Sequence, residues 1–288
     1  MTPGQIRAFL DRAVRLAARG HGGAEPNPMV GCVIATAAGV QVAEGFHRRC
    51  GGPHAEIEAL RAAGDRARGA TAIVTLEPCA HRGRTGPCAD ALIEAGVARV
   101  IYAVRDPNPL ACGGARRLID AGIPAEHFAH AGAEELARPF VKRVTTRLPW
   151  VCAKWAQSVD GAIALGNGDS KWLSGARSRA MVHRERGRVD AVLTGIGTVL
   201  ADAPRLTARG VRVQRQARRV VWDPDARTPP DAPICDGTAP TTLLVSATPD
   251  DGAAKRLDIL RARGVDAIAL GADGAVRPAL AALAERGV

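Results

Sequence analysis

Two short segments of the sequence contain four residues of the types that bind a metal ion or transfer a proton beside one. In "GPHAEIEALRAAG", residues 52–64, His54 and Glu56 are two positions apart at the start of a stretch with helical periodicity. In "TLEPCAHRGRTGPCADALIEAG", Cys79 follows a predicted strand and Cys88 precedes a predicted helix, whose N-terminal dipole favours a thiolate. His54, Cys79 and Cys88 make three candidate zinc ligands, which leaves the fourth tetrahedral position open for water, as in catalytic zinc sites.

Glu56 is the candidate proton shuttle of this group. Zinc lowers the pKa of a bound water toward ~7, and a carboxylate beside the metal can take the water's proton and pass it to a leaving amine. Taken singly, Glu56 is better explained as a helix-start acid, His54 as a helix-cap histidine and the cysteines as two buried thiols than as parts of a metal site. Together, with a proline before the first cysteine, they match the H-x-E and P-C pattern of zinc nucleobase deaminases.

The spacing of the two cysteines departs from the short form of that pattern. Eight residues, "AHRGRTGP", separate Cys79 from Cys88, where nucleic-acid and free-nucleoside deaminases typically have two. The insert is basic and contains glycine, which is typical of a phosphate-binding loop. The sequence therefore favours a phosphorylated substrate.

Length and composition are those of a folded protein of two domains. Of the 288 residues, 47% are apolar and 24% charged, and no apolar run approaches the roughly 20 residues of a membrane span. The N-terminal stretch predicts a docked helix rather than a signal peptide. Seven scattered cysteines favour thiols or metal ligands in a reducing cytoplasm over a disulfide framework. The net charge of +10 suits phosphorylated substrates, dinucleotide phosphates or nucleic acid, although an arginine-rich composition equally reflects genome base composition.

Strands and helices alternate along the chain, which predicts α/β architecture with mixed or parallel sheets. In the first half we expect a helix at the N-terminus, a hairpin of strands 30–35 and 40–46, strands 71–77 and 98–104, and helices 54–66, 89–95, 115–121 and 133–147. In the second half we expect strands 150–157, 190–195, 218–223, 241–246 and 266–270, with helices 176–186, 253–263 and 277–286. We place the domains at 1–147 and 148–288.

Four segments of the first half, "PNPMVG", "HAEIEAL", "EPCAHRGRTGPC" and "DPNP", resemble the deaminase half of the bifunctional riboflavin-biosynthesis deaminase–reductases. The resemblance implies a cytidine-deaminase-like three-layer domain with zinc on His54, Cys79 and Cys88 and with Glu56 as the catalytic residue. It implies that a small phosphorylated pyrimidine, 2,5-diamino-6-(5-phosphoribosylamino)pyrimidin-4-one, is deaminated. The implied substrate contacts are Asn27, His47, Arg84, Asp106 and Asn108; the last two would equally make a turn.

The resemblance continues into the second half. "KWAQSVDGAIALGNGDSKWLSG" and "RVDAVLTGIGTVLADAPRLTAR" are similar to the reductase segments of the same family, which implies a dihydrofolate-reductase-like domain that uses NADPH to reduce the ribosyl to a ribityl chain. The residues implied to face NADPH are Ala156, Trp172, Thr198 and Asp202, and those implied to face substrate are Ser170, Arg186, Leu206 and Arg209. The polar members are expected at strand ends or in loops. Trp172 is equally a packing residue beneath its loop.

"GIG" at residues 195–197 reads only as a strand-to-loop turn, because Leu200 stands where a dinucleotide-binding fingerprint has its third glycine. Compared with the family, the chain also stops before the final strands and a Glu-Gly-Gly turn, so we expect a second domain that lacks its C-terminal end and has doubtful reductase activity.

The alternative function is a nucleic-acid or nucleotide deaminase with a noncatalytic second domain, or with a second domain that serves as a scaffold. The long cysteine spacing and the scarcity of stacking aromatics count against nucleic acid. No membrane partner is expected, and a homo-oligomer is left open.

Overall fold

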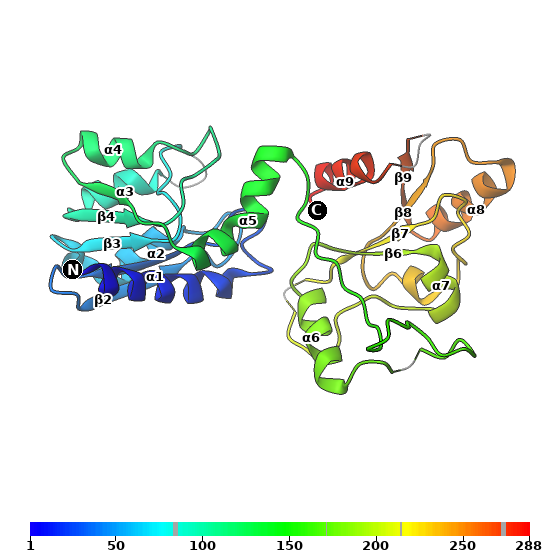
Figure 1. The fold of residues 1–288 in the computed structure, drawn as a ribbon. Helices are drawn as coiled ribbons and strands as arrows, with labels where there is room; N and C mark the ends of the chain where they lie inside the picture. The colour runs from blue at the N-terminus through cyan, green and yellow to red at the C-terminus, as the bar shows by residue number, and fades with distance from the viewer. Residues whose placement is uncertain (83–85, 171, 214, 272–274) are drawn as a thin grey trace. The chain divides into compact units, whose positions relative to one another are not determined.

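The computed structural model describes residues 1–82, 86–170, 172–213, 215–271 and 275–288. The chain divides into two compact units, Met1–Trp150 and Val151–Val288, which are the two groups of elements in Figure 1. In the part of the chain so described, no helix has both the length and the apolar character needed to cross a membrane.

The first unit is built on a mixed five-stranded sheet with the order β2-β1-β3-β4-β5. The strands are β1 (Gly31–Ala35), β2 (Gln41–Phe46), β3 (Thr71–Val74), β4 (Arg99–Tyr102) and β5 (Ala125–His127). β1 pairs antiparallel with β2 and with β3, which confirms the predicted hairpin, while β3, β4 and β5 are parallel. The short strand β5 was not predicted.

Helices cover both faces of this sheet and make a three-layer unit. They are α1 (Pro3–Ala17), α2 (Ala55–Ala63), α3 (Cys88–Glu94), α4 (Gly114–Asp120) and α5 (Ala131–Thr146), with short 3₁₀ turns at Ala18–Gly20 and Gly64–Ala67. Alternate residues of each strand face opposite helices. Ile73 packs in a core with Leu10 of α1, whereas its neighbour Val74 packs with Ala59 of α2 and Leu92 of α3.

Glycine allows α2 to lie close against β2. A Cβ built on Gly45 would stand 2.5 Å from the Ala59 nitrogen and 2.6 Å from the Ala55 oxygen. The fully buried side chains Ala55 and Ala59 complete this contact. Because His54 and Glu56 lie at the start of α2, the contact also determines how far these two residues lie from the sheet.

The second unit contains a parallel four-stranded sheet with the order β6-β7-β8-β9. The strands are β6 (Ala191–Gly195), β7 (Arg218–Trp222), β8 (Thr241–Ser246) and β9 (Asp266–Leu270); the helices are α6 (Ala176–Arg186), α7 (Ile196–Asp202), α8 (Asp251–Ala262) and α9 (Val276–Glu285), with a 3₁₀ turn at Pro233–Cys235. One core joins Leu243 to Val199 of α7 and Leu257 of α8, and another joins Leu244 to Leu283 of α9.

Two expectations for the second unit are wrong. Residues 150–157 form no strand: the chain is irregular there and residues 151–155 are all exposed, so the segment has none of the packing that its apolar residues suggested. The "GIG" stretch does not lead into a loop, because Gly195 caps α7. Burial of Ile196 and Val199 against the sheet stabilises this helix. Thr198 and Asp202 therefore lie on a helix that follows the carboxyl end of β6.

The close approach at Gly45 generates a stability prediction. Gly45→Ala should lower the unfolding temperature of the first unit, because the new methyl group would overpack the contact with α2 at a cost of about 1–3 kcal/mol. The matched control is Gly4→Ala in α1, where the nearest atom to a new Cβ is 3.9 Å away. Differential scanning calorimetry measures both variants, and an unchanged transition in Gly45→Ala would show that α2 shifts freely.

Candidate active site

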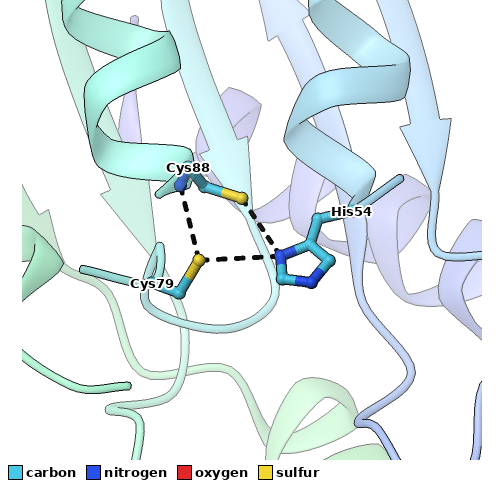
Figure 2. A group of neighbouring side chains, drawn as sticks. All are labelled: His54, Cys79 and Cys88. Carbon is cyan, nitrogen blue, oxygen red and sulfur yellow. Dashed lines mark hydrogen bonds between the residues drawn. The ribbon is translucent and has the colours of Figure 1, made fainter. Parts of the chain in front are cut away.

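His54, Cys79 and Cys88 converge at one point of the first unit (Figure 2). His54 is the N-cap residue of α2, Cys79 lies in the loop after β3, and Cys88 is the first residue of α3. His54 Nδ1 lies 3.2 Å from Cys88 Sγ and 3.6 Å from Cys79 Sγ, and the three donor atoms all lie within 4.8 Å of one another. The structure thus brings together three ligands that come from three different elements.

The donor set fits zinc. One imidazole nitrogen and two sulfur atoms are ligands that zinc prefers, and three protein ligands are typical of catalytic zinc. The hydrogen bond from the Cys88 thiol lowers the pKa of the Cys79 thiol, and the Cys88 backbone N–H also donates to Cys79 Sγ at 3.3 Å. Cys79 is thus stabilised as the thiolate that a metal ligand must be.

Glu56 lies beside this group, in the first turn of α2. Its side chain is only 3% exposed, and it lines the same cavity as His54 and Cys79. Burial raises the pKa of the Glu56 carboxyl to about 7, an effect that the nearby His54 partly offsets. A carboxyl group with a pKa near neutrality both accepts and gives a proton at physiological pH.

Four of the five residues predicted to contact the pyrimidine substrate line this cavity: Asn27, His47, Asp106 and Asn108. The fifth, Arg84, lies outside the described residues. The cavity is lined in addition by Pro28, Val30, Leu76, Glu77, His81, Ala111 and Phe140. Polar groups thus converge on an enclosure with apolar walls, which is typical of small-molecule sites.

His47 is oriented by two hydrogen bonds. Its Nδ1 lies 2.9 Å from the Pro53 carbonyl oxygen, which only accepts, so Nδ1 carries the proton. Nε2 then accepts from the Asn27 amide at 3.3 Å, and burial lowers the pKa of the His47 imidazole, which favours this neutral form. The Asn27 amide nitrogen thus faces His47.

Sequence reasoning missed Glu77, His81 and Phe140. Glu77 and His81 flank the ligand Cys79 in the quoted "EPCAH", and that adjacency was the one signal for them. Phe140 lies on α5, about 60 residues along the chain from Cys79. Only the packing of α5 brings this ring to the cavity, so no local pattern indicated it.

The residues predicted to face NADPH lie on two segments of the second unit. Thr198 and Asp202 lie on α7, while Ala156 and Trp172 lie on the irregular segment before α6. Trp172 is 69% exposed, with the Arg179 guanidinium 4.5 Å from its ring centre, so it is not a packing residue beneath its loop. Within the described ranges, no hydrogen bond or ring contact joins these four side chains to one another.

The predicted reductase substrate residues include a pair of arginines. Burial, and then the positive charge of Arg209, lower the pKa of Arg186. The Arg209 backbone N–H donates to His183 Nδ1 of α6 at 3.2 Å. Leu206 is buried, and Ser170 lies on the irregular segment before α6.

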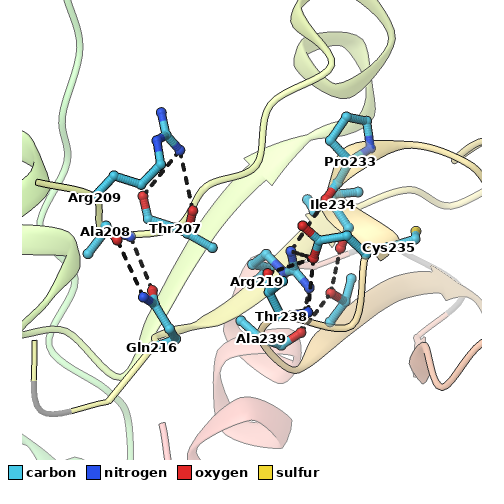
Figure 3. A network of polar contacts seen from close by, with 12 residues as sticks. Thr207, Ala208, Arg209, Gln216, Arg219, Pro233, Ile234, Cys235, Thr238 and Ala239 are labelled. Carbon is cyan, nitrogen blue, oxygen red and sulfur yellow. Dashed lines mark hydrogen bonds and ion pairs between the residues drawn. The ribbon is translucent and has the colours of Figure 1, made fainter.

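The loop that carries Arg209 is held by side-chain hydrogen bonds (Figure 3). Gln216 pairs with the Ala208 backbone in both directions, at 3.2 and 3.3 Å, and Arg209 Nη1 donates to Thr207 Oγ1 at 3.3 Å. This loop carries the positive charge of Arg209, which contributes to the lowered pKa of Arg186. Such a pair of positive charges is stabilised by a bound anion.

Comparison with protein families agrees with both halves of this description. A model for the cytidine and deoxycytidylate deaminase zinc-binding region matches residues 3–104, and a model for the RibD C-terminal domain matches residues 149–288. Fold and site define a two-domain protein in which a zinc-binding domain of the cytidine deaminase type precedes a RibD reductase domain. The chain belongs to the riboflavin biosynthesis protein RibD family.

Relatives and solved structures support this assignment over most of the chain. The RibD of Escherichia coli (strain K12) is 46% identical to this chain in the region that matches. That region makes up 78% of this chain and 62% of the Escherichia coli protein. The RibD of Aquifex aeolicus (strain VF5) is 39% identical over 91% of this chain and 73% of its own length. Acinetobacter baumannii RibD, form 1, superposes with a TM-score of 0.85 at 38% identity, over 99% of this chain and 78% of that one. The deaminase/reductase of Thermotoga maritima superposes with a TM-score of 0.87 at 35% identity. The superposition covers 99% of this chain and 79% of that one.

These findings confirm the resemblance and correct one expectation. The doubt about the reductase activity of the second half is not supported, because the RibD C-terminal domain model matches residues 149–288. The roles of the individual site residues stay predictions.

The zinc assignment predicts the effect of removing one ligand. Cys88→Ser should reduce the metal content from about one zinc per chain to almost none, because three protein ligands leave none to spare. Cys152→Ser, which changes an exposed cysteine of the second unit, should keep its zinc. Inductively coupled plasma mass spectrometry of the purified proteins measures both, and full zinc in Cys88→Ser would refute the assignment.

Proposed function

We propose that the first unit catalyses the hydrolytic deamination of 2,5-diamino-6-(5-phosphoribosylamino)pyrimidin-4-one. The observation that carries the proposal is the buried Glu56, which lines one cavity with His54 and Cys79, while the donor atom of Cys88 lies within 4.8 Å of theirs. The name of the Thermotoga maritima structure, a diaminohydroxyphosphoribosylaminopyrimidine deaminase and 5-amino-6-(5-phosphoribosylamino)uracil reductase, supports the choice of substrate.

The residues of the cavity divide the chemical work. His54, Cys79 and Cys88 would hold a zinc ion, and that ion would supply an activated water as the nucleophile. The Glu56 carboxylate takes the proton from that nucleophile and delivers it to the amine that leaves the ring carbon, which is the step that lets the tetrahedral intermediate collapse to product. Burial of Glu56 excludes bulk water from the transfer.

We expect three polar side chains that line the cavity to orient the pyrimidine ring. The carbonyl oxygen of Asn27 suits a ring amino group, and Asp106 and Asn108 offer further oxygens. The basic insert that contains Arg84 would hold the phosphate. This enclosed site favours a small molecule over nucleic acid, and the reduced cysteines that zinc requires favour the cytoplasm.

For the second unit we propose the NADPH-dependent reduction of the ribosyl group to a ribityl chain. Bound NADPH would supply the hydride. Thr198 and Asp202, on the helix after the carboxyl end of β6, lie at the edge of a parallel sheet where cofactors bind. The pair of Arg186 and Arg209 supports a phosphate contact, because an anion would relieve the repulsion between the two guanidinium groups.

One assay tests the function as a whole. The purified zinc protein is given the diaminopyrimidinone phosphate, and the ultraviolet spectrum is followed with and without NADPH. Deamination is expected without NADPH, and oxidation of NADPH only after deamination or when the deaminated product is supplied. Activity on single-stranded DNA or deoxycytidylate, with none on the diaminopyrimidinone, would favour the alternative deaminase function.

Glu56→Gln is expected to keep its zinc and lower kcat for deamination by ~10²–10⁴-fold, because the amide cannot transfer the proton. The matched control is Glu58→Gln on the same helix, where the carboxylate forms a surface pair with Arg48. Steady-state deamination rates and metal content measure both variants. Near-normal turnover in Glu56→Gln would mean that Glu56 is only an acidic residue at the start of the helix and does not transfer the proton.

Arg186→Ala should raise the KM of the reductase substrate more than it lowers kcat, because a phosphate contact remote from the reacting carbon contributes mainly uniform binding. Arg184→Ala on the same helix is the control, since Arg184 is exposed. NADPH oxidation at varied substrate concentration separates the two constants. A fall in kcat with an unchanged KM would show that Arg186 does not contact the phosphate.

A further inference from the structure

Glu77 joins two neighbouring loops that line the cavity of the first unit, the loop after β3 and the loop of residues 105–113. It lies between the end of β3 and the ligand Cys79, and its backbone N–H donates to the Val104 carbonyl oxygen at 2.8 Å. Glu77 lines the cavity together with Asp106 and Asn108. Neither the zinc group nor the proton transfer described above uses its carboxylate.

The Glu77 carboxylate accepts three backbone hydrogen bonds from the opposite loop. Oε2 accepts from the Asp106 N–H at 3.3 Å. Oε1 accepts from the Gly113 N–H at 3.3 Å and from the Ala115 N–H at 3.1 Å. Because these donors lie on both sides of residues 107–112, one side chain holds the two ends of the loop.

Hydrogen bonds inside the loop fix its shape but do not tie it to the zinc ligands. Asp106 Oδ1 accepts from the Asn108 N–H at 2.9 Å, and Asn108 Oδ1 accepts from the Leu110 N–H at 3.1 Å. The Asn108 carbonyl oxygen accepts from the Ala111 and Cys112 N–H groups, both at 2.9 Å. The loop is therefore a preformed unit whose position still has to be set.

Two further contacts bring the loop to the zinc-ligand segment. The Ala80 N–H donates to the Ala111 carbonyl oxygen at 2.9 Å. Gly114 packs so closely that a Cβ on it would stand 1.7 Å from the Pro78 carbonyl oxygen. These contacts hold the loop against the segment, while the carboxylate of Glu77 is the charged group that fixes both ends.

We propose that Glu77 is a positioning residue that sets the place of Asp106 and Asn108 relative to the ligand Cys79, and so the fit of the pyrimidine ring to the zinc site. The inference rests on the deaminase function proposed above. Glu77 acts through the loop and takes no part in proton transfer.

Glu77→Gln tests the proposal with little change in side-chain size. An amide has one acceptor oxygen, and its NH₂ group would face a backbone N–H, so at least one of the loop contacts is lost. The matched control is Glu126→Gln, which removes an exposed carboxylate that pairs with Arg99 on the neighbouring strand. Zinc content should be unchanged in both variants.

The kinetic arm is a double-mutant cycle with Asp106→Asn. Glu77→Gln should lower kcat/KM for deamination by about 10- to 100-fold, as losses of supporting contacts around metal sites do. In the Glu77→Gln background, Asp106→Asn should cost much less than in the parent protein, because Asp106 is no longer in place. Wild-type kcat/KM in Glu77→Gln, or additive losses, would overturn the proposal. If Glu77→Gln fails to fold, Glu77→Asp replaces it in the double-mutant cycle. Wild-type kcat/KM or additive losses in that variant would likewise overturn the proposal.

A second arm does not depend on the substrate. Hydrogen exchange followed by mass spectrometry should show faster exchange across residues 105–115 in the Glu77 variant than in the parent, with no change in Glu126→Gln. Unchanged exchange in that segment would overturn the positioning role. A parent protein that fails to deaminate the diaminopyrimidinone would instead count against the proposed function, and the exchange result would still decide the role of Glu77.

Discussion

The packing of α2 against the hairpin strands is the constraint on which the candidate active site depends. Gly45 lets the backbone of α2 approach β2 so closely that no side chain fits between them. That contact places His54, the cap of α2, within reach of Cys79 in the loop after β3 and of Cys88 at the start of α3. Glu56 is the second residue of the same helix and is buried beside the candidate ligands.

The two units illustrate two ways of presenting polar groups on an α/β scaffold. In the first unit, the chemistry is enclosed: donors from three elements converge, and burial shifts the pKa of Glu56 to about 7. In the second, Arg186 lies on a helix and Arg209 on a loop, where the Ala208 N–H donates to Gln216 and the Arg209 N–H donates to His183. The proposed proton transfer uses the buried group, and the proposed phosphate contact uses the two arginines.

The sequence predicted most of the first unit, because its signals are local. The His-x-Glu pair, the two cysteines and the alternation of strands and helices are all visible within short windows, and the structure has the elements that they indicated. The roles of Glu77 and Phe140 were not visible, since they arise only when β3, the loop of residues 105–113 and α5 meet around one cavity.

In the second unit, local patterns misled twice. The segment 150–157 has the apolar and β-branched residues of a strand, but a strand needs a partner, and residues 151–155 are exposed. Gly195 and Gly197 suggested a turn, but burial of Ile196 and Val199 against the sheet outweighs the low helix propensity of glycine. Both errors concern tertiary contacts that a window of sequence does not contain.

The central claim is that one nitrogen and two sulfur atoms of this chain hold zinc and leave a position open. Extended X-ray absorption fine structure at the zinc edge of the purified holoprotein tests it directly. The account predicts two sulfur neighbours at about 2.3 Å, with the remaining shell of nitrogen and oxygen at about 2.0–2.1 Å, in a four-coordinate site. A shell of four sulfur atoms, or one without sulfur, would contradict the account, because His54, Cys79 and Cys88 could not then be the three ligands.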